Sequence, residues 1–296
     1  RDQNDMRIIL ADVNSGDFTE VYHETRPTWI DFFEDIYVMK DGSGFIVRSC
    51  RNDWYNLYYY GWDGNLKSQI TNFEWKVTDI ARVDESKKEI YFNGTGPDLL
   101  GGHLFRAKLD GSKLLQITSG DGSHTASVSP GGSYFFETWS SISDPGGVYL
   151  LDRKGKVVHS IHREKVPAYD ASKHQKVELV KIRTSDGLFD MPAIITYPLN
   201  FDPAAKYPVV FTIYGGPDAG SIRNRWQGVQ PRWYAENGIV TISVDHRGSG
   251  VFGKKGLDYM HRSLGKWEIS DYSDAVKWLR QQPWADATRM GITGGS

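Results

Sequence analysis

The run Trp62-Asp63-Gly64 is a turn sequence that returns in similar form along the first half of the chain and decides how that half folds. The four corresponding glycines lie 44 to 48 residues apart, and an apolar segment follows each of them. They are Gly16, Gly64, Gly111 and Gly155. A second series of turns, leading into apolar segments at 45–47, 90–92 and 134–136, alternates with the first. Two strand–turn–strand units within a period of this length are typical of one β-propeller blade.

Residues 1–165 are therefore predicted to form a little more than three antiparallel four-stranded blades. Three blades cannot close a ring, so we expect further blades upstream. The chain opens without Met, at Arg1, and enters a strand pattern almost at once, as a fragment of a larger protein would. The charged stretch at 161–176 interrupts the pattern and is predicted to be a linker.

Bulk properties exclude several classes of protein. A net charge of −2 over 296 residues gives no field that would favour nucleic acid or a membrane surface. Cys50 is the only cysteine, so no internal disulfide can form, and a buried structural thiol is expected. The histidines lack metal-ligand spacing, and no glycine-rich loop fits a nucleotide phosphate. We therefore expect neither a metal nor a cofactor.

The pattern changes at Val177, where strands and helices begin to alternate. Strands are predicted at 177–182, 191–197, 208–214, 238–244 and 289–293, and helices at 226–237 and 270–281. Ser270 is the expected N-cap of the second helix. Apolar runs such as 208–214 are typical of strands buried on both faces of a parallel sheet. Residues 166–296 are thus predicted to hold the linker and an α/β domain.

Two residue groups are expected at the C-terminal edge of this sheet. Gly294-Gly295-Ser296 follows the last predicted strand, where a sharp strand-to-helix turn would expose the serine hydroxyl as a nucleophile. Tyr214 ends the run at 208–214 and could donate its phenol to an oxyanion. The alternatives are a flexible tail and an ordinary strand-end tyrosine. Asp245 and His246 are adjacent, so they point to opposite sides and cannot serve one serine as orienting acid and base.

Taken together, the chain resembles the prolyl oligopeptidase family of serine peptidases, and within it the dipeptidyl peptidase IV branch. The segments that carry the resemblance in the first half are 1–4, 24–29, 122–130 and 138–141. Those in the second half are Tyr214-Gly215-Gly216-Pro217, 245–250, 264–268 and Gly294-Gly295-Ser296. The resemblance implies a partial β-propeller of antiparallel blades followed by the N-terminal part of an α/β-hydrolase domain.

The resemblance also implies roles for two residues. Ser296 would be the acylating nucleophile, and Tyr214 the side-chain oxyanion donor, paired with the backbone N–H of the residue after the serine. In the family, the catalytic Asp and His and the proline pocket lie downstream, and the glutamates that hold the substrate amino group lie upstream. We therefore expect the 296-residue chain alone to be inactive. No substrate-binding residue is assigned, although the cluster at 29–33 is a candidate for facing the substrate cavity.

The expected function is a serine exopeptidase that releases N-terminal dipeptides with proline or alanine in the penultimate position. Within the same family, a tripeptidyl or acylaminoacyl peptidase is the alternative. A non-catalytic propeller–hydrolase that serves as a binding or accessory protein is the alternative from another class, and a propeller binding module with an incidental α/β tail is the third. The partners implied are peptide substrates and a second copy of the protein. A periplasmic, secreted or membrane-anchored location outside the cytoplasm is implied as well.

Overall fold

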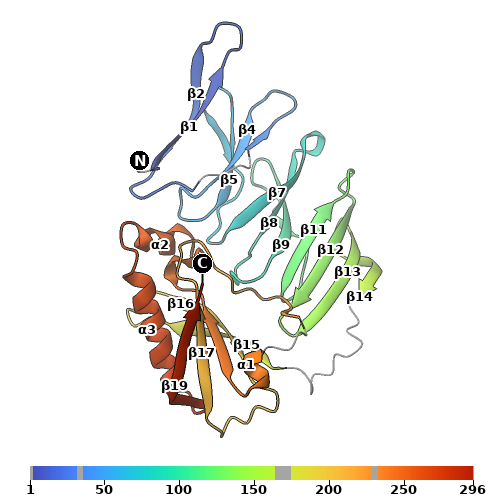
Figure 1. Cartoon of the computed structure of the whole chain (residues 1–296). Coiled ribbons are helices and arrows are strands. Elements are labelled where there is room, and N and C mark those ends of the chain that lie inside the picture. The colour runs from blue at the N-terminus through green and yellow to red at the C-terminus, as the bar shows by residue number, and fades with distance from the viewer. Residues whose placement is uncertain (1–2, 32–35, 164–174, 229–232, 296) are drawn as a thin grey trace.

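The computed structural model describes residues 3–31, 36–163, 175–228 and 233–295 (Figure 1). Residues 3–163, here called the propeller half, form one two-stranded and three four-stranded antiparallel sheets, each made from consecutive strands. The hairpin is β1 (Asp5–Ala11) with β2 (Phe18–Thr25). The four-stranded sheets are β3 (Ile36–Val38), β4 (Phe45–Ser49), β5 (Asn56–Tyr60) and β6 (Leu66–Gln69); β7 (Val77–Asp84), β8 (Glu89–Gly94), β9 (His103–Lys108) and β10 (Leu115–Gln116); and β11 (Ser123–Val128), β12 (Tyr134–Ser141), β13 (Asp144–Asp152) and β14 (Val157–Arg163). The expectation of a little more than three blades is confirmed.

The four repeated glycines adopt one conformation, with positive φ values between 78° and 82°. This left-handed region favours glycine, which explains why the turn sequence recurs. Two of these turns also press on the preceding sheet. A Cβ atom at Gly111 would lie 2.9 Å from the carbonyl oxygen of Gln69, and one at Gly155 would lie 2.0 Å from that of Ile117. The regular spacing of these glycines therefore has two causes, the positive φ of the turn and the close packing of one blade on the next.

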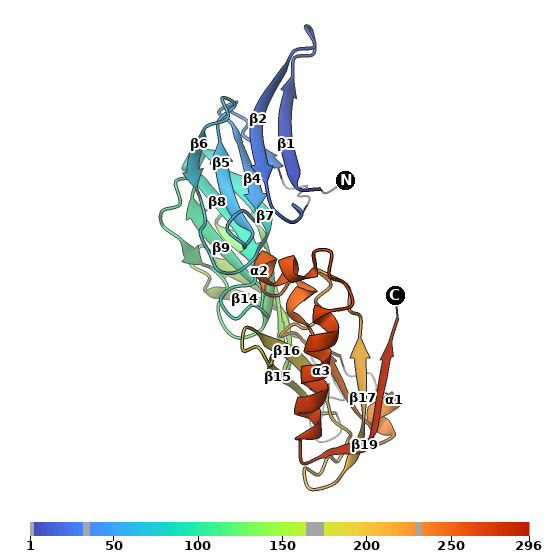
Figure 2. The same ribbon diagram turned by 90° about the vertical axis from the view of Figure 1, so that its left-hand side faces the viewer.

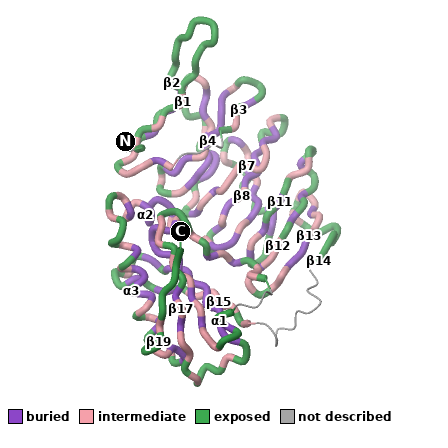
Figure 3. The backbone as a smooth tube through the Cα atoms, viewed as in Figure 1, coloured by how far each residue is buried: buried purple, intermediate pink, exposed green. Residues whose placement is uncertain are grey.

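Apolar side chains fill the space between each pair of consecutive sheets, and Figure 3 shows the buried backbone running through their inner strands. Tyr22 packs with Phe45 between the first two sheets, and Ile46 packs with Phe92 between the next two. The last two sheets share a cluster that includes Tyr91. Large flat side chains suit such face-to-face packing of sheets. Cys50 is buried in this half, as expected.

Residues 175–295, here called the α/β half, contain a mixed five-stranded sheet in the order β15-β16-β18-β17-β19. The strands are β15 (Val177–Arg183), β16 (Asp190–Thr196), β17 (Tyr207–Ile213), β18 (Val240–Val244) and β19 (Ala285–Gly294). The helices are α1 (Trp233–Glu236), α2 (Gly253–Leu257) and α3 (Trp267–Arg280), with short 3₁₀ turns η1 (Glu85–Lys87) in the propeller half and η3 (Arg247–Ser249) and η4 (Asp258–Met260) here. Strand β17 is parallel to both β18 and β19, whereas β15 and β16 add an antiparallel edge.

Two helix predictions differ from the structure. The segment 226–228 is not helical, and the described helix near it covers only Trp233–Glu236. The backbone of the segment 226–228 makes a contact outside any helix, because the N–H of Trp226 donates to the hydroxyl of Ser140 in the propeller half, 3.2 Å away. Helix α3 begins three residues before Ser270, whose N–H donates to the carbonyl oxygen of Lys266, the residue just before the helix. Ser270 is therefore not the N-cap.

The two halves meet at the C-terminal edge of the mixed sheet. Figures 1 and 2 show from two directions that β17 and β19 run toward the side on which the propeller half lies. Helix α3 covers one face of the sheet, where Tyr272, Ala275 and Leu279 join a buried core with Phe211 and Ile242. The predicted domain boundary at 165/166 falls outside the described residues. None of the described helices has the length and hydrophobicity needed to cross a bilayer.

Candidate active site

The ends of two parallel strands bring Tyr214 beside the chain segment that carries the predicted nucleophile. Ile213 of β17 is the register partner of Gly294 of β19, so Tyr214 and Gly295 follow at the same edge. The strands pass so closely that a Cβ atom at Gly294 would lie 2.5 Å from the carbonyl oxygen of Ile213. Ser296 itself lies outside the described residues, so its predicted role stays a prediction.

The turn after Tyr214 contains two glycines, each with its own structural reason. Gly215 has a φ of +86°, in the left-handed region. Gly216 lies under the tyrosine ring, since a Cβ atom there would be 2.4 Å from Cε1 of Tyr214. Tyr214 is 59% exposed and lies at the edge of the sheet. A phenol held on a tight turn and open to solvent is available to a ligand at this edge.

A buried carboxylate holds the chain that continues from this turn. Asp245, at the end of β18, accepts the backbone N–H groups of Ser221 and Ile222, each at 3.0 Å. Burial raises the pKa of Asp245, while these two hydrogen bonds act to lower it. The turn that follows β18 also accepts two N–H groups, from Asp218 at 3.0 Å and from Gly220 at 2.8 Å. The loop after Tyr214 is therefore fastened to the end of the neighbouring strand.

His246 serves a different segment from its neighbour Asp245. Its Nδ1 accepts the N–H of Gly248 at 3.1 Å, and its ring meets Tyr272 edge to face, with centroids 5.5 Å apart. Burial lowers the pKa of His246, which favours the neutral imidazole. Among the described residues its Nε2 has no hydrogen-bond partner. The two adjacent side chains therefore have different roles. Asp245 accepts hydrogen bonds from the loop at 221–222, whereas His246 accepts one from the turn that follows it.

A small cavity of about 110 Å³ lies beneath the turn of Tyr214. Polar groups from three elements line it, among them Ser221, His246, Ser249 and Tyr272. Burial raises the pKa of Tyr272 to about 12, and backbone hydrogen bonds from Gly215 and Tyr214 oppose that rise. The phenol of α3 therefore stays protonated near neutral pH and supports the turn from below.

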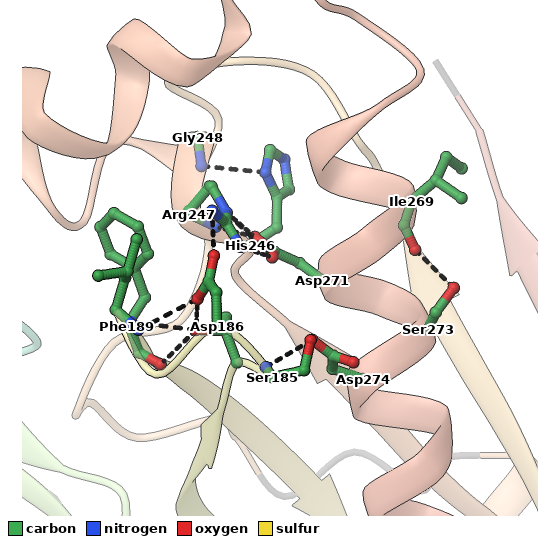
Figure 4. Close-up of polar contacts among 12 residues, drawn as sticks. Ser185, Asp186, Phe189, His246, Arg247, Gly248, Ile269, Asp271, Ser273 and Asp274 are labelled. Atoms are coloured by element: carbon green, nitrogen blue, oxygen red, sulfur yellow. Dashed lines mark hydrogen bonds and ion pairs between the residues drawn. The ribbon is translucent and has the colours of Figure 1, made fainter.

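Arg247 anchors the same strand end from the opposite side (Figure 4). It is 1% exposed. Asp271 of α3 accepts three of its N–H groups, from Nη2 at 2.6 Å, from the backbone at 2.8 Å and from Nε at 3.0 Å. Asp186, in the turn before β16, accepts Nη1 at 2.8 Å. The guanidinium also lies within 5.1 Å of the ring centroids of Phe189, Tyr259 and Trp267. The buried ion pair therefore ties β18, β16 and α3 together.

A second cluster joins the α/β half to the propeller half. Asp258 accepts hydrogen bonds from Thr28 at 2.7 Å and from Arg26 at 3.2 Å. The ammonium of Lys254 is completely buried, 3.3 Å from a carboxylate oxygen of Asp258 and 3.5 Å above the ring centroid of Trp29. The candidate cluster at 29–33 therefore faces α2 through Trp29, whereas residues 32 and 33 lie outside the described part of the chain.

Two further observations concern possible ligands. His124 of β11 contacts buried Glu137 through Nδ1 at 2.7 Å and therefore has a structural hydrogen-bonding role. Within the described ranges there is no group of three or more His, Cys, Asp or Glu side chains placed to hold a metal ion.

Sequence comparison agrees with both halves of this architecture. Residues 1–146 match the family described as the dipeptidyl peptidase IV (DPP IV) N-terminal region. Residues 226–296 match the prolyl oligopeptidase family. The chain belongs to the prolyl oligopeptidase family. Its resemblance to that family, first recognised from short motifs, is therefore confirmed, as is the propeller followed by the start of a hydrolase domain.

Named relatives cover the entire chain. Dipeptidyl peptidase 4 of Trichophyton equinum is 30% identical over 313 residues, an alignment that spans 100% of this chain and 40% of the relative. A probable dipeptidyl-aminopeptidase B of Chaetomium globosum is 27% identical, over 98% of this chain and 33% of the relative. The chain thus spans about 40% of the length of the dipeptidyl peptidase 4 relatives that it matches.

Solved structures show the same fold. The crystal structure of Porphyromonas gingivalis dipeptidyl peptidase 4 superposes with a TM-score of 0.88 at 24% identity, covering 99% of this chain and 42% of that one. A putative dipeptidyl aminopeptidase IV from Bacteroides ovatus superposes with a TM-score of 0.88 at 25% identity, covering 99% and 45%. Both similarities extend across the junction between the propeller half and the α/β half.

Sequence reasoning missed the residues that hold this site together. Arg247, Asp271, Lys254 and Asn224 were not singled out, although Arg247 belongs to a motif that carried the family resemblance. A run of Asp-His-Arg-Gly after an apolar strand could have suggested a buried arginine. No local pattern marks Asn224 or the contact of Lys254 with Trp29, because these partners lie far away in the sequence. Among the described partners of Lys254, only Asp258, four residues away, is a local one.

Proposed function

We propose that this chain forms part of a serine exopeptidase that releases dipeptides from peptide N-termini, with proline or alanine in the penultimate position. The observation that carries the proposal is the parallel register of Ile213 with Gly294, after which Tyr214 and Gly295, the residue before Ser296, follow at one edge. The names of the relatives support the dipeptide as product, since they are called dipeptidyl peptidase 4. The propeller half, above that edge, would limit access to flexible peptide ends.

In the proposed mechanism, the hydroxyl of Ser296 attacks the carbonyl carbon of the scissile bond, and its proton passes to a histidine base that the family places downstream. Tyr214 donates its phenolic hydrogen to the oxygen that becomes negative, together with the backbone N–H after Ser296. The leaving amine takes the proton from the base as the C–N bond breaks, which leaves an acyl-enzyme. Water then repeats the sequence and releases the dipeptide.

Replacing the phenol tests the role of Tyr214. In the full-length protein, Tyr214→Phe should lower kcat by roughly 10²–10³-fold, the usual effect of losing one oxyanion donor, with little change in KM. Tyr234→Phe, on the partly exposed helix α1, is the matched control and should leave both constants unchanged. A small fluorophosphonate should label Ser296 and no longer label the protein after Ser296→Ala. Unchanged kcat in Tyr214→Phe would remove the phenol from the mechanism.

We also propose that residues 1–165 are propeller blades and that residues 166–296 are the linker and the N-terminal portion of the hydrolase domain. The working form is proposed to be a homodimer outside the cytoplasm, in the periplasm, secreted or anchored at a membrane. Sedimentation of the purified full-length protein would measure the first property, and fractionation of the source cells the second. A monomer at micromolar concentration would contradict the dimer.

A further inference from the structure

Asn224 directs all its hydrogen-bonding groups at the propeller half, although it belongs to the loop that follows Tyr214. Its Nδ2 donates to Asp121 at 2.7 Å, and its Oδ1 accepts the N–H of Ile142 at 3.0 Å. Its own N–H donates to the carbonyl oxygen of Leu100 at 2.9 Å, and its carbonyl oxygen accepts the hydroxyl of Ser123 at 2.9 Å. The residue is buried, with 7% of its surface exposed.

The four partners come from three separate connections in two neighbouring sheets. Leu100 precedes β9, Asp121 and Ser123 lie at the start of β11, and Ile142 lies in the turn between β12 and β13. Asn224 therefore occupies the corner at which the two sheets meet. An apolar cluster that includes Ile222 and Leu100 adjoins this corner, and Asn224 itself is buried there, although its partner Asp121 is exposed. Leaving a buried donor or acceptor of Asn224 without its partner would cost free energy of desolvation.

The same short loop reaches the proposed oxyanion donor. Asp245 holds the N–H groups of Ser221 and Ile222, so the chain immediately before Asn224 is fixed to the end of β18. One rigid path thus runs from Tyr214, through the loop capped by Asp245, to the propeller half. Lys76, the residue before β7, also approaches this path, with its ammonium 3.7 Å from the carboxylate of Asp218.

We propose that Asn224 is a positioning residue that fixes the propeller half over the edge carrying Tyr214. This proposal rests on the proposed peptidase function, since it concerns how a peptide that touches both halves is held. A ligand that reaches both halves is aligned for reaction only if their relative position is fixed. A small reagent that reacts at the sheet edge alone does not depend on that position. Loss of Asn224 should therefore weaken peptide binding and spare the intrinsic reactivity of the serine.

The test uses the full-length protein and an exchange of donor and acceptor. Asn224→Asp removes the donor and places two carboxylates together, so KM for a peptide substrate should rise about 10-fold, with a smaller change in kcat. Adding Asp121→Asn restores a donor–acceptor pair while the N–H of Ile142 keeps its acceptor. The double variant should recover most of the loss. Asn237→Ala, in the exposed turn after α1, should match wild type and controls for the loss of an asparagine.

Labelling by a small fluorophosphonate separates the possible failures. Asn224→Asp should be labelled at a rate within about twofold of wild type, because that reaction needs only the sheet edge. A KM that does not change in Asn224→Asp, or that the double variant fails to restore, overturns the positioning role. A proportional loss of labelling and peptide turnover also overturns it, because the defect would then lie in the serine environment. Absence of both labelling and turnover in wild type would instead refute the proposed function itself.

Discussion

The buried pair of Arg247 and Asp271 gives a sharp prediction about what stabilises the site. Both side chains are sealed from solvent, with exposures of 1% and 0%. In Asp271→Ala the guanidinium would keep one carboxylate partner, Asp186, and lose the hydrogen bonds that its Nε and Nη2 donate to Asp271. The backbone N–H of Arg247 would lose its acceptor as well. The substitution therefore leaves a buried cation with one of its two carboxylate partners and a buried backbone N–H group with no acceptor.

The expected loss of stability follows from that geometry. Removing one member of a buried ion pair typically costs about 3–5 kcal/mol, because the remaining charge stays desolvated. Hydrogen bonds to charged groups contribute roughly 1.5–3 kcal/mol each but are not additive, so the first range is the relevant one. By contrast, the exposed pair of Arg183 and Asp190 should contribute only about 0.2–1 kcal/mol. Asp190→Ala is therefore the matched control.

Urea unfolding of the full-length protein, followed by tryptophan fluorescence, measures these differences at constant m-value. A double variant, Arg247→Met with Asp271→Ala, removes the guanidinium of Arg247 as well. Methionine can occupy the space among Phe189, Tyr259 and Trp267 that the guanidinium fills. The double variant should thus recover at least about 1 kcal/mol relative to Asp271→Ala.

Two results would refute this reasoning. If Asp271→Ala cost no more than Asp190→Ala, the pair would contribute as little as a surface contact does. If the double variant were no more stable than Asp271→Ala, the penalty would arise from lost packing or from the helix rather than from an unpaired cation. Either outcome would remove the basis for treating Arg247 as the anchor of β18.

Three further predictions concern other parts of the molecule. Lys254→Met should destabilise the protein by about 1–3 kcal/mol in urea, because Asp258 would lose the cation 3.3 Å away and Trp29 would lose its cation–π contact, whereas exposed Lys255→Met should change stability by less than about 0.5 kcal/mol. Burial depresses the pKa of His246 below its ordinary value of 6.5, so the unfolded chain binds the proton more readily than the folded chain does. The contribution of neutral His246 to the free energy of unfolding is therefore complete above that pH and is lost as the pH falls. The free energy of unfolding of His246→Gln should decline less than that of wild type between about pH 7 and 5. Gly155→Ala should cost at least about 2 kcal/mol more than Gly187→Ala in thermal unfolding, since both glycines have positive φ but only the first presses on another sheet; equal costs would mean that the blade contact can relax.

The parts of the fold that could be predicted are those set by local chemistry. The glycine at each repeated turn is required by a positive φ, so Gly64 and its counterparts mark the blades in the sequence itself. Strand β17 was evident because a run of apolar residues is typical of a sheet strand, but the expectation that both of its faces are buried is wrong for this structure. Val209 and Phe211 are buried on one face, whereas Thr212 on the other face is exposed. The start of α3 was not evident, since Ser270 has the chemistry of a cap while the helix in fact begins at Trp267. Contacts of that helix with distant residues, such as that of Asp271 with Arg247, override the local preference.

The candidate site divides in the same way. Tyr214 could be predicted because a Gly-Gly-Pro turn after a buried strand fixes where the phenol stands. Asn224 could not, because asparagine is common in turns for local reasons and its partners lie about 80 to 120 residues away in the chain. The loop from 215 to 224 has almost no regular secondary structure, yet it is held by Asp245 at one end and by the propeller half at the other. If the proposed chemistry needs the phenol at a fixed position relative to a peptide that also touches the propeller half, the loop is where that position is set.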